Sequence, residues 1–118
     1  MSKRTERWLV TGGAGFIGSH IAARLRQQGR RVTVLDNLVT GKRENLDFAR
    51  PNVFIKGDIR DPGAVRRAVR GATYVLHQAA LRSVPRSLED PYSSDEVNVH
   101  GTLTLLLEAS KAKVKRFV

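Results

Sequence analysis

A glycine-rich turn near the start of the chain constrains its fold more than any other feature. Gly12, Gly15 and Gly18 are spaced three residues apart at the junction between the short apolar run 8–10 and the segment 16–28. The short run is typical of a buried strand. The longer segment repeats apolar residues at helical spacing and is followed by glycine, a helix stop signal. A strand, a tight turn and a helix in this order predict the first unit of an α/β protein with a parallel sheet.

The rest of the chain repeats this alternation. Short apolar runs predict further strands at residues 32–35, 53–55 and 74–76, and a fifth strand beginning at residue 117. Near-continuous apolar strands favour a sheet that is buried on both faces. We therefore expect one domain over residues 1–118, with the α/β fold of a Rossmann-type doubly wound parallel sheet, truncated at its fifth strand.

Two further helices connect these strands. Asp61 is a capping residue with Pro62 behind it, which predicts a helix that ends near Gly71. A longer helix is expected from about residue 91 or 94 to residue 111. Its apolar residues are expected to face inward: Val97, Leu103, Leu106, Leu107 and Ala109. Residues 38–51 are polar and are expected to form a loop with a helical turn near 44–48.

The glycine spacing has a specific chemical use. Gly12 permits the tight turn, Gly15 lets the backbone approach a pyrophosphate, and Gly18 lets the helix pack closely on the strand. The helix N-terminus then offers backbone N–H groups to the phosphates. Asp36 ends the second strand, where a carboxylate can accept hydrogen bonds from an adenosine ribose and would repel a 2′-phosphate. These residues predict a dinucleotide site that prefers NAD to NADP, although the nearby cations Lys42 and Arg43 could accommodate a phosphate.

Composition excludes several other classes of protein. The chain has 118 residues, no cysteine, and 21 Lys and Arg against 11 Asp and Glu, a formal charge of +10. Without cysteine there is no disulfide scaffold, iron–sulfur site or thiolate zinc site, and no His, Asp and Glu set has metal-ligand spacing. The positive charge is spread over both halves of the chain, which disfavours nucleic-acid binding. No apolar run is long enough for a membrane helix, so we expect a cytoplasmic protein without a membrane partner.

Five motifs, in order, resemble the extended short-chain dehydrogenase/reductase family, in particular its NAD-dependent nucleotide-sugar epimerases and dehydratases. They are Thr11-Gly-x-x-Gly-x-x-Gly18, Asp36-Asn-Leu38, Gly57-Asp-Ile-Arg-Asp61, His77-Gln-Ala-Ala80 and Asn98-Val-His-Gly-Thr102. The segment Ser83-Val-Pro-Arg-Ser87 followed by Asp90-Pro91 resembles the epimerases that act on UDP-glucose or UDP-N-acetylglucosamine. The resemblance covers essentially the whole chain.

The resemblance implies a role for each matching residue. The amides of Phe16 and Ile17 would hold the pyrophosphate, Asp36 and Asn37 the ribose, and Asp58 and Ile59 would flank the adenine. The remaining cofactor positions would be Ala79, Ala80, Arg82 and Asn98. Ser83 and Val84 would approach the nicotinamide and the sugar. Structural alternatives stay open: Asp58 could simply end a strand, Asn98 could be a buried polar residue, and His77 could make only structural hydrogen bonds.

The family's catalytic pair, Tyr-x-x-x-Lys, is missing from this sequence. Gln78 stands four residues after Tyr74, and Glu96 stands four residues after Tyr92. We therefore expect no catalytic residue here, and interpret the chain as the NAD-binding N-terminal portion of a UDP-sugar 4-epimerase that is inactive alone. Two alternatives are a portion of a 4,6-dehydratase or UDP-glucuronate-modifying enzyme, and a non-catalytic NAD-binding module. Because a sheet that stops at its fifth strand leaves an open edge, we also expect self-association as a homodimer or by strand exchange.

Overall fold

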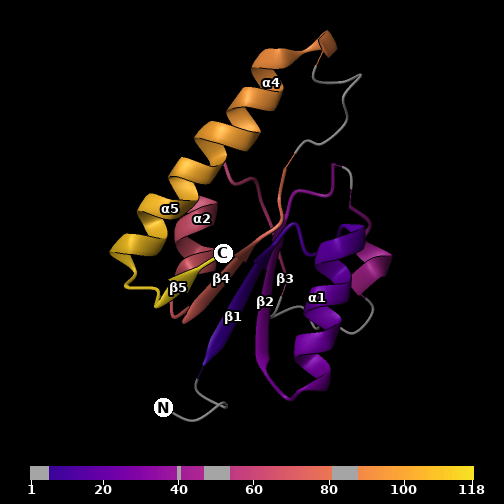
Figure 1. Cartoon of the computed structure of the whole chain (residues 1–118), viewed down its shortest axis with the longest axis vertical. Coiled ribbons are helices and arrows are strands. Elements are labelled where there is room, and N and C mark those ends of the chain that lie inside the picture. The colour runs from indigo at the N-terminus through magenta and orange to yellow at the C-terminus, as the bar shows by residue number, and fades with distance from the viewer. Residues whose placement is uncertain (1–5, 40, 47–53, 81–87) are drawn as a thin grey trace.

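The computed structural model describes residues 6–39, 41–46, 54–80 and 88–118, and its centre is a sheet of five parallel strands (Figure 1). The strands are β1 (Arg7–Thr11), β2 (Arg31–Asp36), β3 (Phe54–Lys56), β4 (Tyr74–His77) and β5 (Arg116–Phe117). Their order in the sheet is β3-β2-β1-β4-β5, so β1 is central, with Trp8 opposite Val32 on one side and Tyr74 on the other. The predicted parallel α/β sheet is confirmed.

The helices start and stop largely where the sequence signals them. They are α1 (Phe16–Gln27), the 3₁₀ turn η1 (Arg43–Leu46), α2 (Pro62–Val69), α4 (Pro91–Asp95), the π-helical segment η3 (Glu96–Gly101) and α5 (Thr102–Lys111). The Asp61 side chain accepts a hydrogen bond from the Gly63 amide at 3.0 Å and caps α2, as predicted. Gly29 after α1 has a φ of +76°, which favours glycine. The predicted long helix is present as α4, η3 and α5 in succession (Figure 1).

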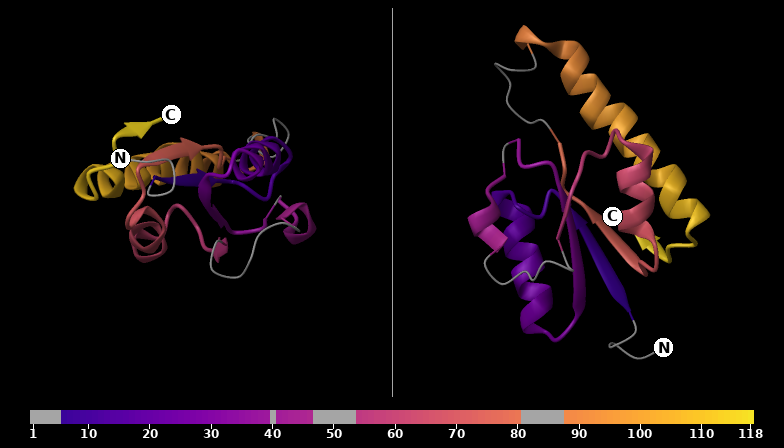
Figure 2. Two further views of the ribbon diagram at one scale, coloured as in Figure 1. Left: turned by 90° about the horizontal axis from the view of Figure 1, so that it is seen from below. Right: turned by 180° about the vertical axis from the view of Figure 1, so that it is seen from behind.

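Two hydrophobic clusters lie on opposite faces of the sheet because side chains alternate along each strand. On one face, Val10 and Val34 pack against Ala22 and Leu25 of α1. On the other face, Leu9 and Val75 of the sheet pack against residues of α2 and the long helix: Val65, Ala68, Val69, Leu105 and Ala109. Figure 2 shows α1 and α2 on opposite sides of the strands. This arrangement leaves the carboxyl ends of the central strands at one end of the sheet, between the two helical layers.

The prediction for the inward face of the long helix was partly wrong. Val97 and Ala109 are buried as expected, whereas Leu103, Leu106 and Leu107 are 54%, 42% and 53% exposed. The buried residues of η3 and α5 are Val97, Gly101, Leu105, Glu108 and Ala109, and all of them except Glu108 recur every four residues. The helix has apolar residues on more than one face, and the sheet and α2 take the face with the smaller side chains. No helix in the described part of the chain is long and apolar enough to cross a bilayer.

Candidate functional site

A cleft opens at the carboxyl ends of β1 to β4, where ligands bind in open α/β sheets. It encloses about 540 Å³, counting the solvent-filled space at its mouth. The lining residues come from five separate stretches of chain: Gly12, Gly15, Leu35, Asp36, Asn37, Val39, Gly57, Asp58, Ile59, Gln78, Ala79, Ala80 and Val97. Within the described ranges, no group of three or more His, Cys, Asp or Glu side chains could hold a metal ion.

The glycine-rich turn forms the floor of this cleft, and two of its glycines are required by the backbone. Gly12 has a φ of +68°, and a Cβ at this position would lie 2.8 Å from the backbone nitrogen of Ala79. A Cβ on Gly18 would overlap the carbonyl oxygen of Gly12. The turn is therefore in close contact with the end of β4 on one side and with α1 on the other. The positive φ of Gly12 agrees with the tight turn predicted there, and the space around Gly18 agrees with its predicted close packing.

The start of α1 is suited to an anion. Gly15 is its N-cap, so no side chain caps the helix, and no acidic residue occupies its first turn. Gly15 also lines the cleft, and the helix begins at Phe16. The first N–H groups of a helix have no partner within the helix and carry the positive end of its dipole. The N-terminus of α1 therefore offers donors to a phosphate group beside the cleft.

Asp36 links the turn to the loop that follows β2. The residue is 7% exposed, and its carboxylate accepts hydrogen bonds from the Ala14 amide at 2.9 Å and from the Leu38 amide at 2.7 Å. Hydrogen bonds to a carboxylate are worth roughly 1.5–3 kcal/mol each, so the position of this side chain is well determined. Because Asp36 is held by both amides and also lines the cleft, it places a negative charge at the predicted ribose position.

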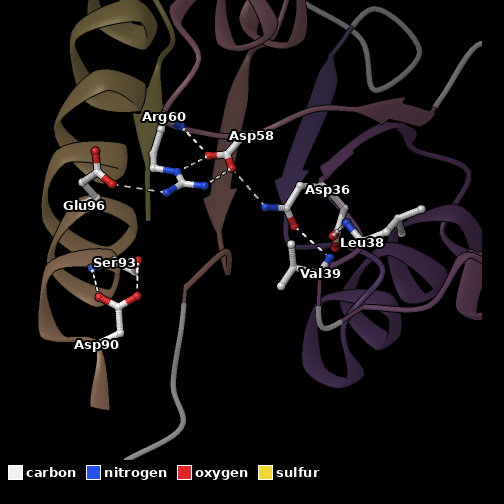
Figure 3. Close-up of polar contacts among 9 residues, drawn as sticks. Asp36, Leu38, Val39, Asp58, Arg60, Asp90, Ser93 and Glu96 are labelled. Atoms are coloured by element: carbon white, nitrogen blue, oxygen red, sulfur yellow. Dashed lines mark hydrogen bonds and ion pairs between the residues drawn. The ribbon is translucent and has the colours of Figure 1, made fainter. Parts of the chain in front are cut away.

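Asp58 is the centre of a second polar group on the cleft (Figure 3). Arg60 donates to it from Nε at 3.0 Å, from Nη2 at 2.7 Å and from its backbone amide at 2.8 Å, while Asn37 donates from Nδ2 at 3.2 Å. Hydrogen bonds from the Arg60 side chain are the main cause that lowers the pKa of Asp58 to about 2. Arg60 also reaches Glu96 at 3.4 Å, which connects the loop after β3 to the long helix. Asp58 is therefore an ionised acceptor at the edge of the cleft.

The wall opposite Asp36 is the backbone that follows β4. The amides of Gln78 and Ala79 donate to the Thr11 hydroxyl oxygen at 3.1 and 3.2 Å, and the Gln78 amide also reaches the Thr11 carbonyl at 3.0 Å. These bonds join the ends of β1 and β4. Small side chains at Ala79 and Ala80 leave the cleft open on this side.

Most of the site residues that were predicted from the sequence line the cleft. Eight of them line it: Gly12, Gly15, Asp36, Asn37, Asp58, Ile59, Ala79 and Ala80. Phe16, Ile17 and Gly18 lie at the start of α1. Asn98 is an exposed residue of η3, so the alternative that it is buried was wrong, and its neighbour Val97 lines the cleft instead. Arg82, Ser83 and Val84 lie outside the described residues.

Five lining residues were not anticipated: Leu35, Val39, Gly57, Gln78 and Val97. Gln78 and Gly57 each stand beside a predicted site residue, and Leu35 precedes Asp36. Their positions follow from the strand ends, because every strand of a parallel sheet delivers its next residues to the same edge. No similar feature of the sequence identifies Val97 as a cleft residue, because only the packing of the long helix brings it to the cleft.

Comparisons with known proteins agree with this geometry. The NAD dependent epimerase/dehydratase family model matches residues 8–118. The UDP-glucose 4-epimerase of Yersinia enterocolitica is 41% identical over 118 residues, covering 93% of this chain and 35% of that protein. This chain thus spans about a third of the length of such relatives.

Two solved structures are also similar. One is a Thermus thermophilus UDP-glucose 4-epimerase in complex with NAD, with a TM-score of 0.85, 50% identity, and coverage of 94% of this chain and 36% of that one. The other is a dTDP-glucose 4,6-dehydratase of Streptomyces venezuelae with NAD bound, with a TM-score of 0.83, 43% identity, and coverage of 94% and 38%.

Proposed function

Because the chain belongs to the NAD dependent epimerase/dehydratase family, we propose that the cleft at the strand ends binds NAD and serves UDP-sugar 4-epimerisation. The observation that carries the proposal is the convergence of the glycine turn, Asp36 and Asp58 on one cleft. When bound, NAD supplies a reversible hydride acceptor for the sugar carbon that is oxidised and re-reduced. This chain's own residues bind and orient the cofactor. The Tyr-x-x-x-Lys pair that moves the proton is not among its 118 residues.

Each part of the dinucleotide has a suitable partner in the cleft. The pyrophosphate would lie at the uncapped start of α1, with the backbone of the glycine turn beneath it. Asp36 and Asn37 would accept from the ribose hydroxyls, and the ionised Asp58 with Ile59 would flank the adenine. The cofactor would lie close to the wall formed by Ala79 and Ala80 because their side chains are small. Roles for Arg82, Ser83, Val84 and Asn98 remain predictions.

The test compares NAD with NADP by titration calorimetry in wild type and Asp36→Asn. Loss of the Asp36 charge removes its repulsion of a 2′-phosphate, so the preference for NAD over NADP should narrow by about tenfold. Asp36→Asn keeps the side-chain shape but only one of the two oxygens that accept from the Ala14 and Leu38 amides, so circular dichroism first checks that the variant is folded. Asp95→Asn, which removes the same charge at an exposed position on α4, is the matched control and should leave the preference unchanged. Failure of wild type to bind NAD, or an unchanged preference in Asp36→Asn, would refute the site.

A 4,6-dehydratase portion is the second candidate, favoured by the 43% identity to the Streptomyces dehydratase. The two are separated by adding, in parallel experiments, the remaining two-thirds of the Thermus epimerase and of the Streptomyces dehydratase as separate polypeptides, because those parts supply the catalytic residues. Formation of the C4 epimer from UDP-glucose with the first partner alone supports the epimerase, and formation of a 4-keto-6-deoxy sugar from dTDP-glucose with the second partner alone supports the dehydratase. A complementation that yields neither product, with both polypeptides folded and NAD bound, favours the third alternative, a non-catalytic NAD-binding module.

We also propose that the chain self-associates through the exposed apolar side of η3 and α5. Val99, Leu103 and Leu106 follow one another at helical spacing and are all exposed. A second copy could cover them by packing the same stripe against itself about a two-fold axis. Sedimentation at increasing concentration should give a dimer for wild type and a monomer for Leu103→Lys, with Arg67→Gln on α2 as the control. A wild type that stays monomeric at the highest concentration would exclude this contact. The cytoplasmic location remains a prediction.

A further inference from the structure

His77 occupies a junction between the cleft wall, the central strand and the long helix. It is the last residue of β4 and is half-buried. Its Nδ1 lies 2.6 Å from the hydroxyl oxygen of Thr11 on β1, and its Nε2 lies 2.8 Å from the hydroxyl oxygen of Thr102, the first residue of α5. The imidazole therefore bridges two hydroxyl groups that belong to different layers of the fold.

The partners of these hydroxyl groups determine where the imidazole carries its proton. The Thr11 oxygen accepts from the amides of Gln78 and Ala79, which occupies its lone pairs and leaves its proton for Nδ1. The Thr102 hydroxyl donates to the Asn98 carbonyl at 2.8 Å, so it is free to accept a proton from Nε2. Both contacts are satisfied only by a neutral ring with hydrogen on Nε2 and none on Nδ1.

Each end of this chain of hydrogen bonds reaches a part of the cleft. Through Thr11 it holds Gln78 and Ala79, both of which line the cleft. Through Thr102 it holds the carbonyl of Asn98 within η3, the π-helical segment whose Val97 lines the opposite edge. π-Helical turns are uncommon and recur at functional sites, and here the Asn98 carbonyl accepts from the side chain of Thr102, the residue that follows the π-helical segment.

We propose that His77 is a positioning residue that sets the separation of the cleft's two edges, and that it does so only as the neutral Nε2–H tautomer. This inference rests on the proposed dinucleotide site. It makes NAD affinity depend on the protonation of a side chain that does not touch the cofactor.

Protonation of the ring disrupts the arrangement at Thr11. A hydrogen on Nδ1 would point at an oxygen whose lone pairs are already engaged, and the Thr11 proton would lose its acceptor in a fully buried position. Burial of the ring lowers the pKa of His77 below its ordinary value of 6.5, which favours the neutral form. The charged side chains on the surrounding elements have other partners or positions. Glu96 pairs with Arg60, His100 with Asp95, and Glu108 with Arg66 and Lys111. Arg7 lies near Gly71, and Arg116 is exposed.

The tautomer is measured directly, without NAD, by ¹⁵N NMR of the histidine side chains in the wild-type chain. At pH 7.5 we expect one ring, assigned to His77 by its loss in His77→Asn, with hydrogen on Nε2 and a bare Nδ1. A proton on Nδ1 at this pH would overturn the proposal, whatever the chain binds.

The functional consequence is measured by NAD titrations from pH 8 down to the pH at which the ¹⁵N signals of His77 show that its ring is protonated. Wild-type affinity should fall about fivefold as His77 is protonated, the loss expected when one buried hydrogen bond is broken. His77→Asn keeps an acceptor near the Nδ1 position but cannot be protonated, so its affinity should lack this fall. His100→Asn, which changes an exposed histidine of η3, should keep this fall in affinity.

A second variant covers the case in which His77→Asn does not fold. Thr102→Val removes the partner of Nε2 at a partly exposed position and should weaken NAD binding about fivefold at pH 8. Equal pH profiles for wild type and His77→Asn, or wild-type affinity in Thr102→Val, would overturn the positioning role alone. Absence of NAD binding at every pH would overturn the proposed function together with it.

Discussion

Gly101, the last residue of η3, allows the long helix to pack against the cleft residue Ile59. A Cβ at position 101 would lie 2.6 Å from both Cγ1 and Cδ1 of Ile59, and Ile59 is only 4% exposed. Carbon atoms in favourable contact are about 3.5–4.0 Å apart, so the Gly101→Ala change requires a displacement of about 1 Å. Cγ1 is close to the Ile59 backbone, so rotation of the side-chain end alone cannot relieve the overlap.

Two opposing contributions determine how much Gly101→Ala changes the free energy of unfolding. Overpacking a well-packed core costs about 1–3 kcal/mol, and replacing glycine by alanine within a helix returns about 1 kcal/mol. The net expectation is a free energy of unfolding lowered by about 1 kcal/mol. Because Ile59 lines the cleft, its displacement should also weaken NAD binding.

Urea unfolding of wild type, Gly101→Ala and Gly63→Ala measures this difference. Gly63 is a helical glycine of α2 whose Cβ would meet only the Asp61 Oδ1 atom, at 3.4 Å. Alanine at position 63 should therefore stabilise the chain by up to about 1 kcal/mol. If Gly101→Ala stabilises the chain as much as Gly63→Ala does, the packing of Ile59 against the helix is not as described.

Two further changes test the turn and the polar group at the cleft edge. Gly12→Ala places a Cβ 2.8 Å from the Ala79 nitrogen at a φ of +68° and should lower the free energy of unfolding by at least about 2 kcal/mol. Gly29→Ala, at a φ of +76° with no atom within 4 Å of the new Cβ, should lower it by only about 1 kcal/mol. Thermal or urea unfolding measures both variants. Equal losses would show that the close approach to β4 does not matter. The pKa of Asp58 is about 2 when folded against an ordinary 3.8, so its contribution to stability is present above pH 3.8 and is lost as the pH falls toward 2. Allowing for solvent screening, we expect about 1 kcal/mol, which urea unfolding between pH 5 and pH 2 should find in wild type and in Arg67→Gln. The effect should be smaller in Arg60→Gln, where the backbone amide of residue 60 and Asn37 still donate to Asp58. The same pH dependence in Arg60→Gln would argue against Arg60 as its source.

Local patterns in the sequence were sufficient to predict the helices and strands and most of the cleft residues. Glycine spacing, the Asp61 cap and the apolar runs are short-range signals, and they located the strands, α1 and α2 to within a few residues. Asp36 could be nominated because a strand end determines which edge of a parallel sheet its next residue reaches.

Contacts between distant residues were harder to predict. Helical spacing revealed the apolar residues of the long helix but not which face would meet the sheet, so Leu103, Leu106 and Leu107 were misplaced. The π-helical segment and the ion pair of Arg60 with Glu96 have no local signature. The role of Gly101 depends on its contact with Ile59, which stands forty-two residues earlier in the sequence. A pattern of neighbouring residues therefore cannot predict this role.

The central position of β1 affects the order in which the cleft can assemble during folding. Arg7 meets Arg31 of β2 after 24 residues, whereas Trp8 meets Tyr74 of β4 after 66. Closing the longer loop costs about 0.9 kcal/mol more in chain entropy. We therefore expect the glycine turn to form beside β2 before the wall at residues 79–80 joins it. A dinucleotide that needs both sides stabilises only the completed sheet, so it should slow unfolding without accelerating the first pairing of strands.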